Sequence, residues 1–316
     1  MLLKPIFIAG CDRSGTTMLG DLLGANSHAI VTPESQFVHE LLLLMHNRHF
    51  NNSKQVAQWL QNHFFFSNWH IDDGLQQLIE LDDPRQTVLN IVTRYQQKNN
   101  ATKNAARFWI DHTPDNFKYY AVLKYYFPEA HYIHIVRDGR AVYNSVKSLK
   151  WGPNNAYMSA RYWSERIRQA LLVEMAEAQN CLRLRYEDIV SDTETCLQLT
   201  CDRFALPYEA AMVYGGGLKL PGFTKGQHKL VGKKPDASRI HSWQKKLKQK
   251  EINDFESYFW SKAYLEMFNY PLLLNQPHQP SSIRMLWSYL HDFVMYAVHR
   301  LQHKMMEGKV IRGEFK

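Results

Sequence analysis

The segment that most constrains the fold is residues 6–17, IFIAGCDRSGTT, in which a short apolar run leads into a loop flanked by glycines. The run predicts a buried strand and the residues after Gly15 predict a helix, an arrangement that presents backbone amides to an anion. The spacing from Gly10 to Gly15 matches the nucleotide P-loop pattern G-x-x-x-x-G-K-[ST], except that Thr16 replaces the lysine. P-loop enzymes use that lysine on the β- and γ-phosphates, so its absence favours an anion with less charge than a triphosphate.

This loop carries its own set of donors for such an anion. Arg13 offers a planar fork of N–H groups, the start of the helix offers backbone amides, and hydroxyl groups add hydrogen bonds. The residues concerned are Arg13, Ser14, Gly15, Thr16 and Thr17. The alternative interpretation is a glycine-rich turn between strand and helix that binds no ligand.

Strand and helix patterns alternate along the chain. Apolar runs predict strands at 6–10, 29–31, 107–111, 132–136 and 182–186, and helical spacing predicts helices at 15–25, 155–179, 195–204 and 249–267. In residues 32–34, Thr32 is a candidate N-cap, Pro33 a first helical residue and Glu34 a first-turn carboxylate. The order predicts an α/β fold: a P-loop NTPase-like single domain with a mostly parallel central sheet flanked by helices, and ligands at the carboxyl ends of the strands.

Composition shifts divide the chain into segments. We expect a main domain over residues 1–270, with a helical insertion at 35–100 beside the acceptor and a basic lid loop at 214–240. The alternative for 214–240 is a solvated insertion. Residues 271–282 contain three prolines and predict a linker, and residues 283–316 predict a C-terminal amphipathic helix and tail.

The C-terminal helix has a nearly continuous apolar stripe at spacings of three and four residues, with Arg284, Arg300 and Lys304 as basic residues. Three interpretations stay open: the helix docks on its own domain, it forms a homodimer, or it makes a peripheral membrane contact.

Charge and cysteine content narrow the function classes. The chain carries a formal net charge of +8, which favours anionic ligands, acidic substrates or an anionic membrane surface. Its 15 histidines show no metal-ligand spacing, so we expect no metal. The four cysteines do not form a disulfide framework, and no uncharged apolar run reaches 18 residues. We therefore expect a cytoplasmic protein that is at most associated with a membrane surface.

A second strand-to-helix anion site is predicted at residues 132–142, where a buried strand runs into Arg137. Ser145 follows Arg137 by eight residues, so the two lie on roughly one face of a helix near its positive end. A surface ion pair of Arg137 with Asp138 or Glu129 is the alternative.

These two sites together resemble the sulfotransferase family that uses 3'-phosphoadenosine 5'-phosphosulfate (PAPS). The resemblance implies that Arg13 to Thr17 bind the 5'-phosphosulfate and that Arg137 and Ser145 bind the 3'-phosphate. It extends to Tyr186, which would approach the nucleotide, and to Ser238 and Arg239 at the end of the basic loop. The motifs look closest to tyrosylprotein sulfotransferases and their bacterial relatives.

The resemblance implies transfer of a sulfonate group from PAPS to a hydroxyl by in-line displacement, without a metal. We expect a small-molecule, glycan or lipid-linked acceptor, and a tyrosylprotein sulfotransferase is the alternative. Two further readings stay open: a P-loop kinase, which would need magnesium and ATP, and a non-catalytic polyanion-binding protein. The lysines of the basic loop are not interleaved with aromatic residues, which argues against a nucleic-acid partner.

Catalysis is assigned by the same resemblance to Glu34, Arg13, His112 and Ser238. Glu34 is our candidate for the general base, because the tyrosylprotein branch has a glutamate at the matching place. Related sequences usually carry lysine at the position of His112. A protonated His112 could assist the leaving oxygen, or His112 could itself be the base.

Overall fold

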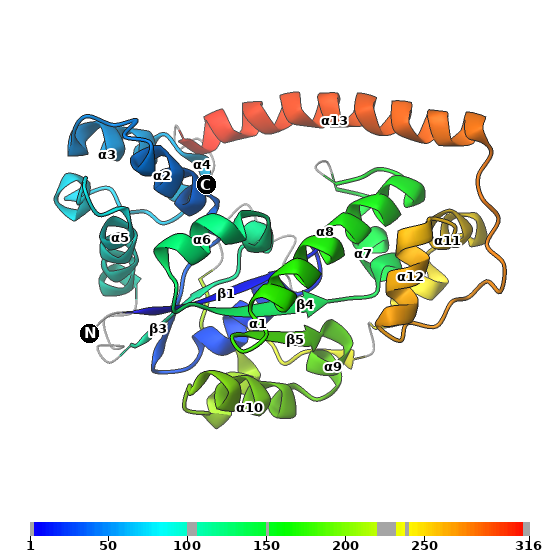
Figure 1. Ribbon diagram of the computed structural model, residues 1–316, viewed down its shortest axis with the longest axis horizontal. Helices are drawn as coiled ribbons and strands as arrows, with labels where there is room; N and C mark the ends of the chain where they lie inside the picture. Colours follow the sequence, from blue (N-terminus) through cyan, green and yellow to red (C-terminus); the bar gives the residue numbers. More distant parts are fainter. Residues whose placement is uncertain (1–2, 100–105, 150–151, 220–231, 238–239, 312–316) are drawn as a thin grey trace.

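The computed structural model describes residues 3–99, 106–149, 152–219, 232–237 and 240–311 (Figure 1). Their core is one five-stranded sheet in the order β2-β3-β1-β4-β5, and all its pairings are parallel. The strands are β1 (Lys4–Gly10), β2 (Ala29–Val31), β3 (Phe108–Asp111), β4 (His131–Val136) and β5 (Cys181–Arg185). The predicted α/β architecture is confirmed, and all five predicted strands are present.

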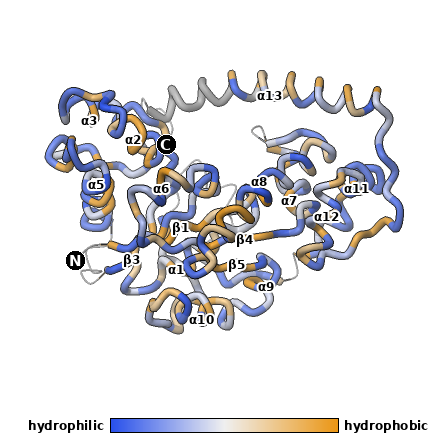
Figure 2. Tube along the Cα trace, in the orientation of Figure 1, coloured by the Kyte–Doolittle hydropathy of each residue, from blue (hydrophilic) through white to orange (hydrophobic). Residues whose placement is uncertain are grey.

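Helices cover both faces of the sheet. Neighbouring side chains of β1 point to opposite faces, and because they are apolar on both, each face is buried under helices. Ile6 and Ile8 pack with α1 (Thr16–Gly24) and α10 (Thr193–Phe204) on one face. Phe7 and Ala9 belong to a second cluster on the other face, toward α8 (Ala156–Ala176) and the helices of the 35–100 segment. Figure 2 shows apolar residues along β1 and β4, as expected for strands buried on both faces.

The segment 35–100 is mostly helical, as predicted, over its described residues. It contains α2 (Gln36–His46), α3 (Ser53–Gln61), α4 (Phe64–Ser67), the 3-10 helix η1 (Leu75–Leu78) and α5 (Pro84–Asn99). The expected helix start at Pro33 is wrong, because α2 begins at Gln36. The Ser35 backbone N–H donates to Thr113 Oγ1 at 2.8 Å, which holds the residues before α2 against the end of β3.

Between the strands lie η2 (Pro114–Tyr119), α6 (Tyr120–Tyr126), α7 (Gly139–Val146) and α8. The last strand is followed by α9 (Tyr186–Ser191), and after α10 come η3 (Ala210–Tyr214) and η6 (Ser242–Lys245). The single helix predicted at 249–267 is instead two, α11 (Gln249–Glu256) and α12 (Phe259–Met267). The chain breaks at Tyr258, whose backbone is extended. The Ser261 hydroxyl donates to the carbonyls of Phe255 and Tyr258, which satisfies acceptors that the break leaves free.

The last helix, α13 (Ser282–Ile311), crosses the outside of the molecule from the α11 and α12 side toward α4 (Figure 1). No helix within the described residues is long and apolar enough to cross a membrane.

Candidate active site

Each strand of the sheet has a predicted site residue shortly after its carboxyl end. Arg13 follows β1, Glu34 follows β2, His112 follows β3, Arg137 follows β4 and Tyr186 follows β5. Because all strands are parallel, these ends lie along one edge of the sheet. Strand β1 lies between β3 and β4, where the strand order changes direction, and ligands of such folds bind there.

The loop after β1 is held in a conformation that only certain residues tolerate. Gly15 has a φ of 105°, and a Cβ atom there would lie 2.7 Å from Cδ2 of Tyr186. Arg13 also has a positive φ, 67°. The Ser14 side chain is fully buried, and its hydroxyl has no hydrogen-bond partner among the described residues. The loop therefore makes a tight backbone turn and leaves the Ser14 hydroxyl as a donor just before α1. Thr16 and Thr17, the first residues of α1, are also buried.

The two predicted anion sites adjoin each other. Arg137 Nη1 donates to the Arg13 carbonyl oxygen at 2.7 Å, and Arg13 Nε donates to Ser145 Oγ at 3.1 Å. Loss of solvation, together with the positive charge of Arg137, lowers the pKa of Arg13. Two guanidinium groups held this close favour a ligand that brings several negative charges.

Tyr186 supports the second of these arginines. The Arg137 guanidinium lies 4.0 Å from the centre of the Tyr186 ring, within cation–π range. The Nε of Arg137 is buried and makes no hydrogen bond within the described part of the chain. Arg137 therefore has a buried N–H that is left without an acceptor, and an anionic ligand could accept a hydrogen bond from it.

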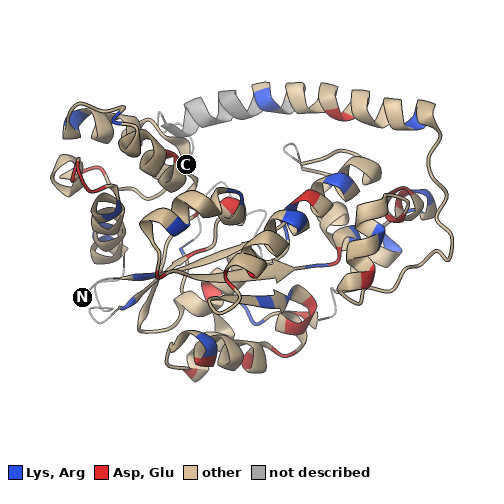
Figure 3. Ribbon diagram, viewed as in Figure 1, with Lys and Arg blue, Asp and Glu red and all other residues tan. Residues whose placement is uncertain are grey.

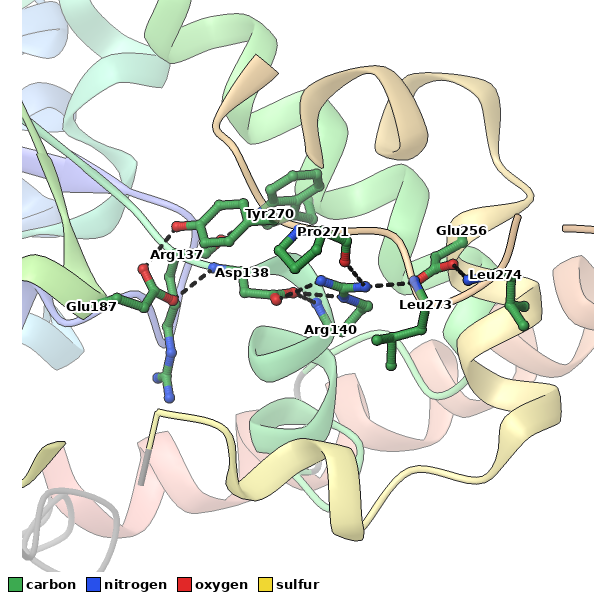
Figure 4. A network of polar contacts seen from close by, with 10 residues as sticks. Arg137, Asp138, Arg140, Glu187, Glu256, Tyr270, Pro271, Leu273 and Leu274 are labelled. Carbon is green, nitrogen blue, oxygen red and sulfur yellow. Dashed lines mark hydrogen bonds and ion pairs between the residues drawn. The ribbon is translucent and has the colours of Figure 1, made fainter. Parts of the chain in front are cut away.

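A buried polar network fixes the backbone that follows Arg137 (Figure 4). Arg140 is 1% exposed and pairs with Asp138, Nη2 to Oδ2 at 2.8 Å, and with Glu256, Nη1 to Oε1 at 2.5 Å. The Asp138 N–H and the Tyr270 hydroxyl both donate to Glu187, which follows Tyr186. The network therefore connects the ends of β4 and β5 to α11 and to the chain after α12.

A second polar cluster holds the β1 loop from its other side. The Tyr162 hydroxyl donates to Asp12, and Arg166 lies 3.7 Å from Asp12 and 2.5 Å from Asp115. Both Tyr162 and Arg166 belong to α8. The sequence did not predict this cluster, because its members are far apart in the chain. The one available signal was the position of Asp12 next to Arg13.

The loop that carries Glu34 is tied to the end of β3. The Ser35 hydroxyl donates to Asp111, and the Thr113 hydroxyl donates to the other Asp111 oxygen at 2.7 Å. Trp69 Nε1 donates to the Glu34 carbonyl oxygen at 3.4 Å. Together these contacts position the backbone of Glu34 from two separate segments.

Glu34 has a strongly perturbed carboxyl group. The side chain is half-buried, and its loss of solvation raises its pKa from 4.5 to about 8, with the carboxylates of Asp12, Asp111 and Asp115 adding to the effect. A carboxylate with such a pKa is a far stronger base than a solvated one.

His112, directly after β3, points toward the face of the sheet that α1 covers. Its imidazole packs on α1, where a Cβ at Gly20 would lie 2.9 Å from His112 Cδ2. The ring is 2% exposed, and neither nitrogen has a hydrogen-bond partner among the described residues. Burial lowers the pKa of His112, against the opposing effect of Asp111, so the neutral form is favoured.

Two predicted site residues, Ser238 and Arg239, lie outside the described residues, as does most of the predicted lid at 214–240. Across the described ranges, no group of three or more His, Cys, Asp or Glu residues is placed to hold a metal ion.

Asp21 of α1 joins the two sides of the basic loop. Its carboxylate is buried and accepts backbone N–H groups from Gly216 at 3.0 Å, Leu218 at 2.9 Å and Gly232 at 2.8 Å. Residues 216–218 and 232 flank the segment 220–231. The sequence gives no sign of this role, because the partners are about two hundred residues away.

Replacing Asp21 by Ala is expected to lower the free energy of unfolding by about 2 kcal/mol, because three N–H groups lose one shared charged acceptor. Urea unfolding of the whole chain measures this change. Asp188→Ala is the control, since Asp188 is 57% exposed and contacts Arg185 only at 3.9 Å, and it is expected to cost less than about 1 kcal/mol. Equal losses for the two variants would show that the Asp21 contacts do not stabilise the fold.

Comparison with known proteins identifies the family and the fold of the chain. The family profile described as "Sulfotransferase family" matches residues 5–210, which is more than half of the chain. The sequence is 23% identical over 218 residues to protein-tyrosine sulfotransferase A of Caenorhabditis elegans, covering 66% of this chain and 52% of that protein. The chain thus spans about half the length of this curated relative.

Two solved structures share the fold. The sulfotransferase domain of the olefin synthase from Synechococcus PCC 7002 superimposes with a TM-score of 0.59 at 19% identity, covering 86% of this chain and 97% of that domain. The sulfotransferase domain from the curacin biosynthetic pathway gives a TM-score of 0.57 at 19% identity, covering 86% and 99%.

Proposed function

The chain belongs to the sulfotransferase family, and we propose that it transfers a sulfonate group from PAPS to a hydroxyl group of a small-molecule, glycan or lipid-linked acceptor. The observation that carries the proposal is the junction of the two anion sites, where Arg137 donates to the Arg13 carbonyl and Arg13 donates to Ser145. A donor with a phosphosulfate at one position and a phosphate at another requires two such sites side by side.

The chain's residues fit such a donor in the following way. Arg13, Ser14 and the backbone amides of Gly15, Thr16 and Thr17 hold the end that carries the sulfonate. Arg137 and Ser145 hold the 3'-phosphate, and Tyr186 packs beside them. The unpartnered Ser14 hydroxyl and Arg137 Nε are donors that this binding would use. Ser238 and Arg239 remain candidates for binding the same nucleotide donor.

When bound, PAPS supplies the sulfonate and a phosphate leaving group. Glu34 accepts the proton of the acceptor hydroxyl, since its raised pKa makes it a competent base. Arg13 and the amides of the loop stabilise negative charge where the sulfonate is held. His112 stabilises the departing oxygen as an electrophilic or proton-sharing group. Burial favours the neutral form of its imidazole.

A protein tyrosine is the second candidate acceptor. The curated relative is named as a protein-tyrosine sulfotransferase. The assignment of Glu34 as the base also rests on a resemblance to the tyrosylprotein branch. Assays with labelled PAPS should therefore include tyrosine peptides beside sugars, lipids and simple alcohols. We further propose a reducing compartment, because the four cysteines, Cys11, Cys181, Cys196 and Cys201, are free thiols.

Arg137→Ala is expected to raise the Kd for adenosine 3',5'-bisphosphate about 10–100-fold, because a charge-assisted contact to the 3'-phosphate is lost. Calorimetry without magnesium measures this affinity. The same variant should leave the Kd for adenosine 5'-phosphate, which has no 3'-phosphate, nearly unchanged.

The matched control for Arg137→Ala is Arg203→Ala, which removes an exposed arginine of α10. An equal loss of affinity for both nucleotides would contradict the assignment of Arg137 to the 3'-phosphate. Tight binding of ATP that needs magnesium, with none of the bisphosphate, would instead favour a P-loop kinase.

A further inference from the structure

The helix α13 contacts the body of the protein through several polar groups. The Ser288 carbonyl accepts from Asn155 at 3.1 Å, and Asp292 accepts from the Asn154 backbone N–H at 3.1 Å. Arg284 pairs with Asp254. The three α13 residues in these contacts, 284, 288 and 292, are spaced four apart and so lie along one side of the helix.

The opposite side of α13 is apolar and faces outward (Figure 2). Its large side chains each expose between 49% and 73% of their surface: Ile283, Leu286, Leu290, Phe293, Val294 and Leu301. A surface helix of a globular protein normally places its apolar side against the core and its polar side in water. The reversed orientation of α13 indicates that its apolar side meets another apolar phase.

The charges around this surface favour a lipid bilayer over a second copy of the chain. The chain has a net charge of +8, so two copies repel each other while an anionic surface attracts each one. Arg300 is exposed at the edge of the apolar side, one turn beyond Ala297. Asp292, the one acidic residue from 282 to 301, is engaged with the body through the Asn154 backbone N–H. Figure 3 shows basic positions of α13 on both sides of its acidic one.

The shape and residue types of the surface point the same way. The apolar residues cover a broader arc than the narrow seam with which two helices pair in a coiled coil. Trp287 and Tyr296, 68% and 58% exposed, are of the types that collect at the boundary between lipid and water. A single convex helix buries such an arc more completely in a flat interface than against another helix.

We propose that the outer side of α13, residues 283–301, docks the protein on an anionic bilayer surface, with the helix lying parallel to the membrane plane. The far part of α13 reaches α4 in the 35–100 segment (Figure 1). Docking therefore brings that segment close to the bilayer. This inference does not depend on the proposed sulfonate transfer.

The test is cosedimentation of the full chain with vesicles of equal parts phosphatidylcholine and phosphatidylglycerol, and with vesicles of phosphatidylcholine alone. The wild-type protein should bind the anionic vesicles, and the double variant Leu290→Asp/Phe293→Asp should bind at least about tenfold more weakly. The control Leu172→Asp/Met175→Asp changes two exposed apolar residues of α8 and should bind like the wild type.

Thermal unfolding of each variant and light scattering of the wild type complete the test. All the replaced side chains are exposed, so the melting temperatures should agree. Equal vesicle binding by the wild type and Leu290→Asp/Phe293→Asp overturns the proposal. A wild-type dimer that ignores vesicles and dissociates in that variant overturns it as well and assigns the surface to self-association.

Discussion

Replacing Glu34 by Gln is expected to lower kcat with PAPS and a hydroxyl acceptor by about 10²–10⁴-fold, the usual contribution of a positioned general base. The amide has nearly the shape of the carboxyl group but cannot accept the proton. The contacts that hold the loop, from Ser35 to Asp111 and from Trp69 to the Glu34 carbonyl, do not involve the replaced atoms. Donor affinity should therefore stay close to that of the wild type.

Two further variants make this result specific. Glu40→Gln changes an exposed glutamate of α2, the helix that follows Glu34, and should leave kcat within about twofold of the wild type. His112→Ala should cost less than Glu34→Gln, because the ring packs on α1 and favours its neutral form. If Glu34→Gln kept nearly full turnover while His112→Ala lost several hundredfold, the base would be His112.

The pH dependence offers a second readout of the same variant. The pKa of Glu34, raised to about 8 by loss of solvation, implies that kcat/KM rises with pH up to about 8. Between the ordinary pKa of 4.5 and about 8, the native state holds a proton that the unfolded state has released. This group therefore makes the protein less stable as pH rises through that window. Both dependences should be absent in Glu34→Gln.

The positions of the candidate site residues could be predicted because each depends on local sequence. Apolar runs end just before Arg13, His112 and Arg137, and a parallel sheet brings the ends of its strands to one edge. The P-loop spacing likewise marks a tight turn, and Gly15 indeed has a positive φ. Such features need no knowledge of distant contacts.

What the sequence could not show are the contacts between distant segments. Asp111 joins Ser35 across 76 positions, and Asp21 holds Gly232 across 211. No periodicity reports such pairs, because each partner looks like an ordinary polar residue in its own segment. The start of α2 at Gln36 depends on such a contact, from the Ser35 N–H to Thr113, which outweighs local helix propensity. The break at Tyr258 is different, because the hydrogen bond of Ser261 to the Tyr258 carbonyl is local.

The same limit applies to α13. Its amphipathic pattern predicts a helix with one buried side, and by pattern alone that side would be the apolar one. The polar contacts of Ser288 and Asp292 with the chain around Asn154 reverse this assignment. Amphipathicity thus establishes that a helix has two sides, while the partner of each side depends on the rest of the fold.

Replacing Arg140 by Met is expected to lower the free energy of unfolding by about 3–5 kcal/mol, the usual cost of removing one partner from a buried ionic cluster. Met fills a similar space but leaves Asp138 and Glu256 buried without their cation, and both are less than 10% exposed. Arg140 also donates to the Pro271 carbonyl at 3.0 Å and lies 4.4 Å from the Trp243 ring centre. Calorimetry should show a melting temperature lower by about 5–8 °C.

The matched control is Arg168→Met, which breaks an ion pair with Glu165 on the surface of α8, where the two side chains are 56% and 47% exposed. That pair should contribute less than about 1 kcal/mol. Adding Glu256→Gln to Arg140→Met should recover part of the loss, because it removes one of the two uncompensated charges. Equal melting temperatures for Arg140→Met and Arg168→Met would mean that the cluster does not hold α11 to the end of β4. In that case the backbone after Arg137 would be fixed by the contacts of Glu187 with Asp138 and Tyr270 alone.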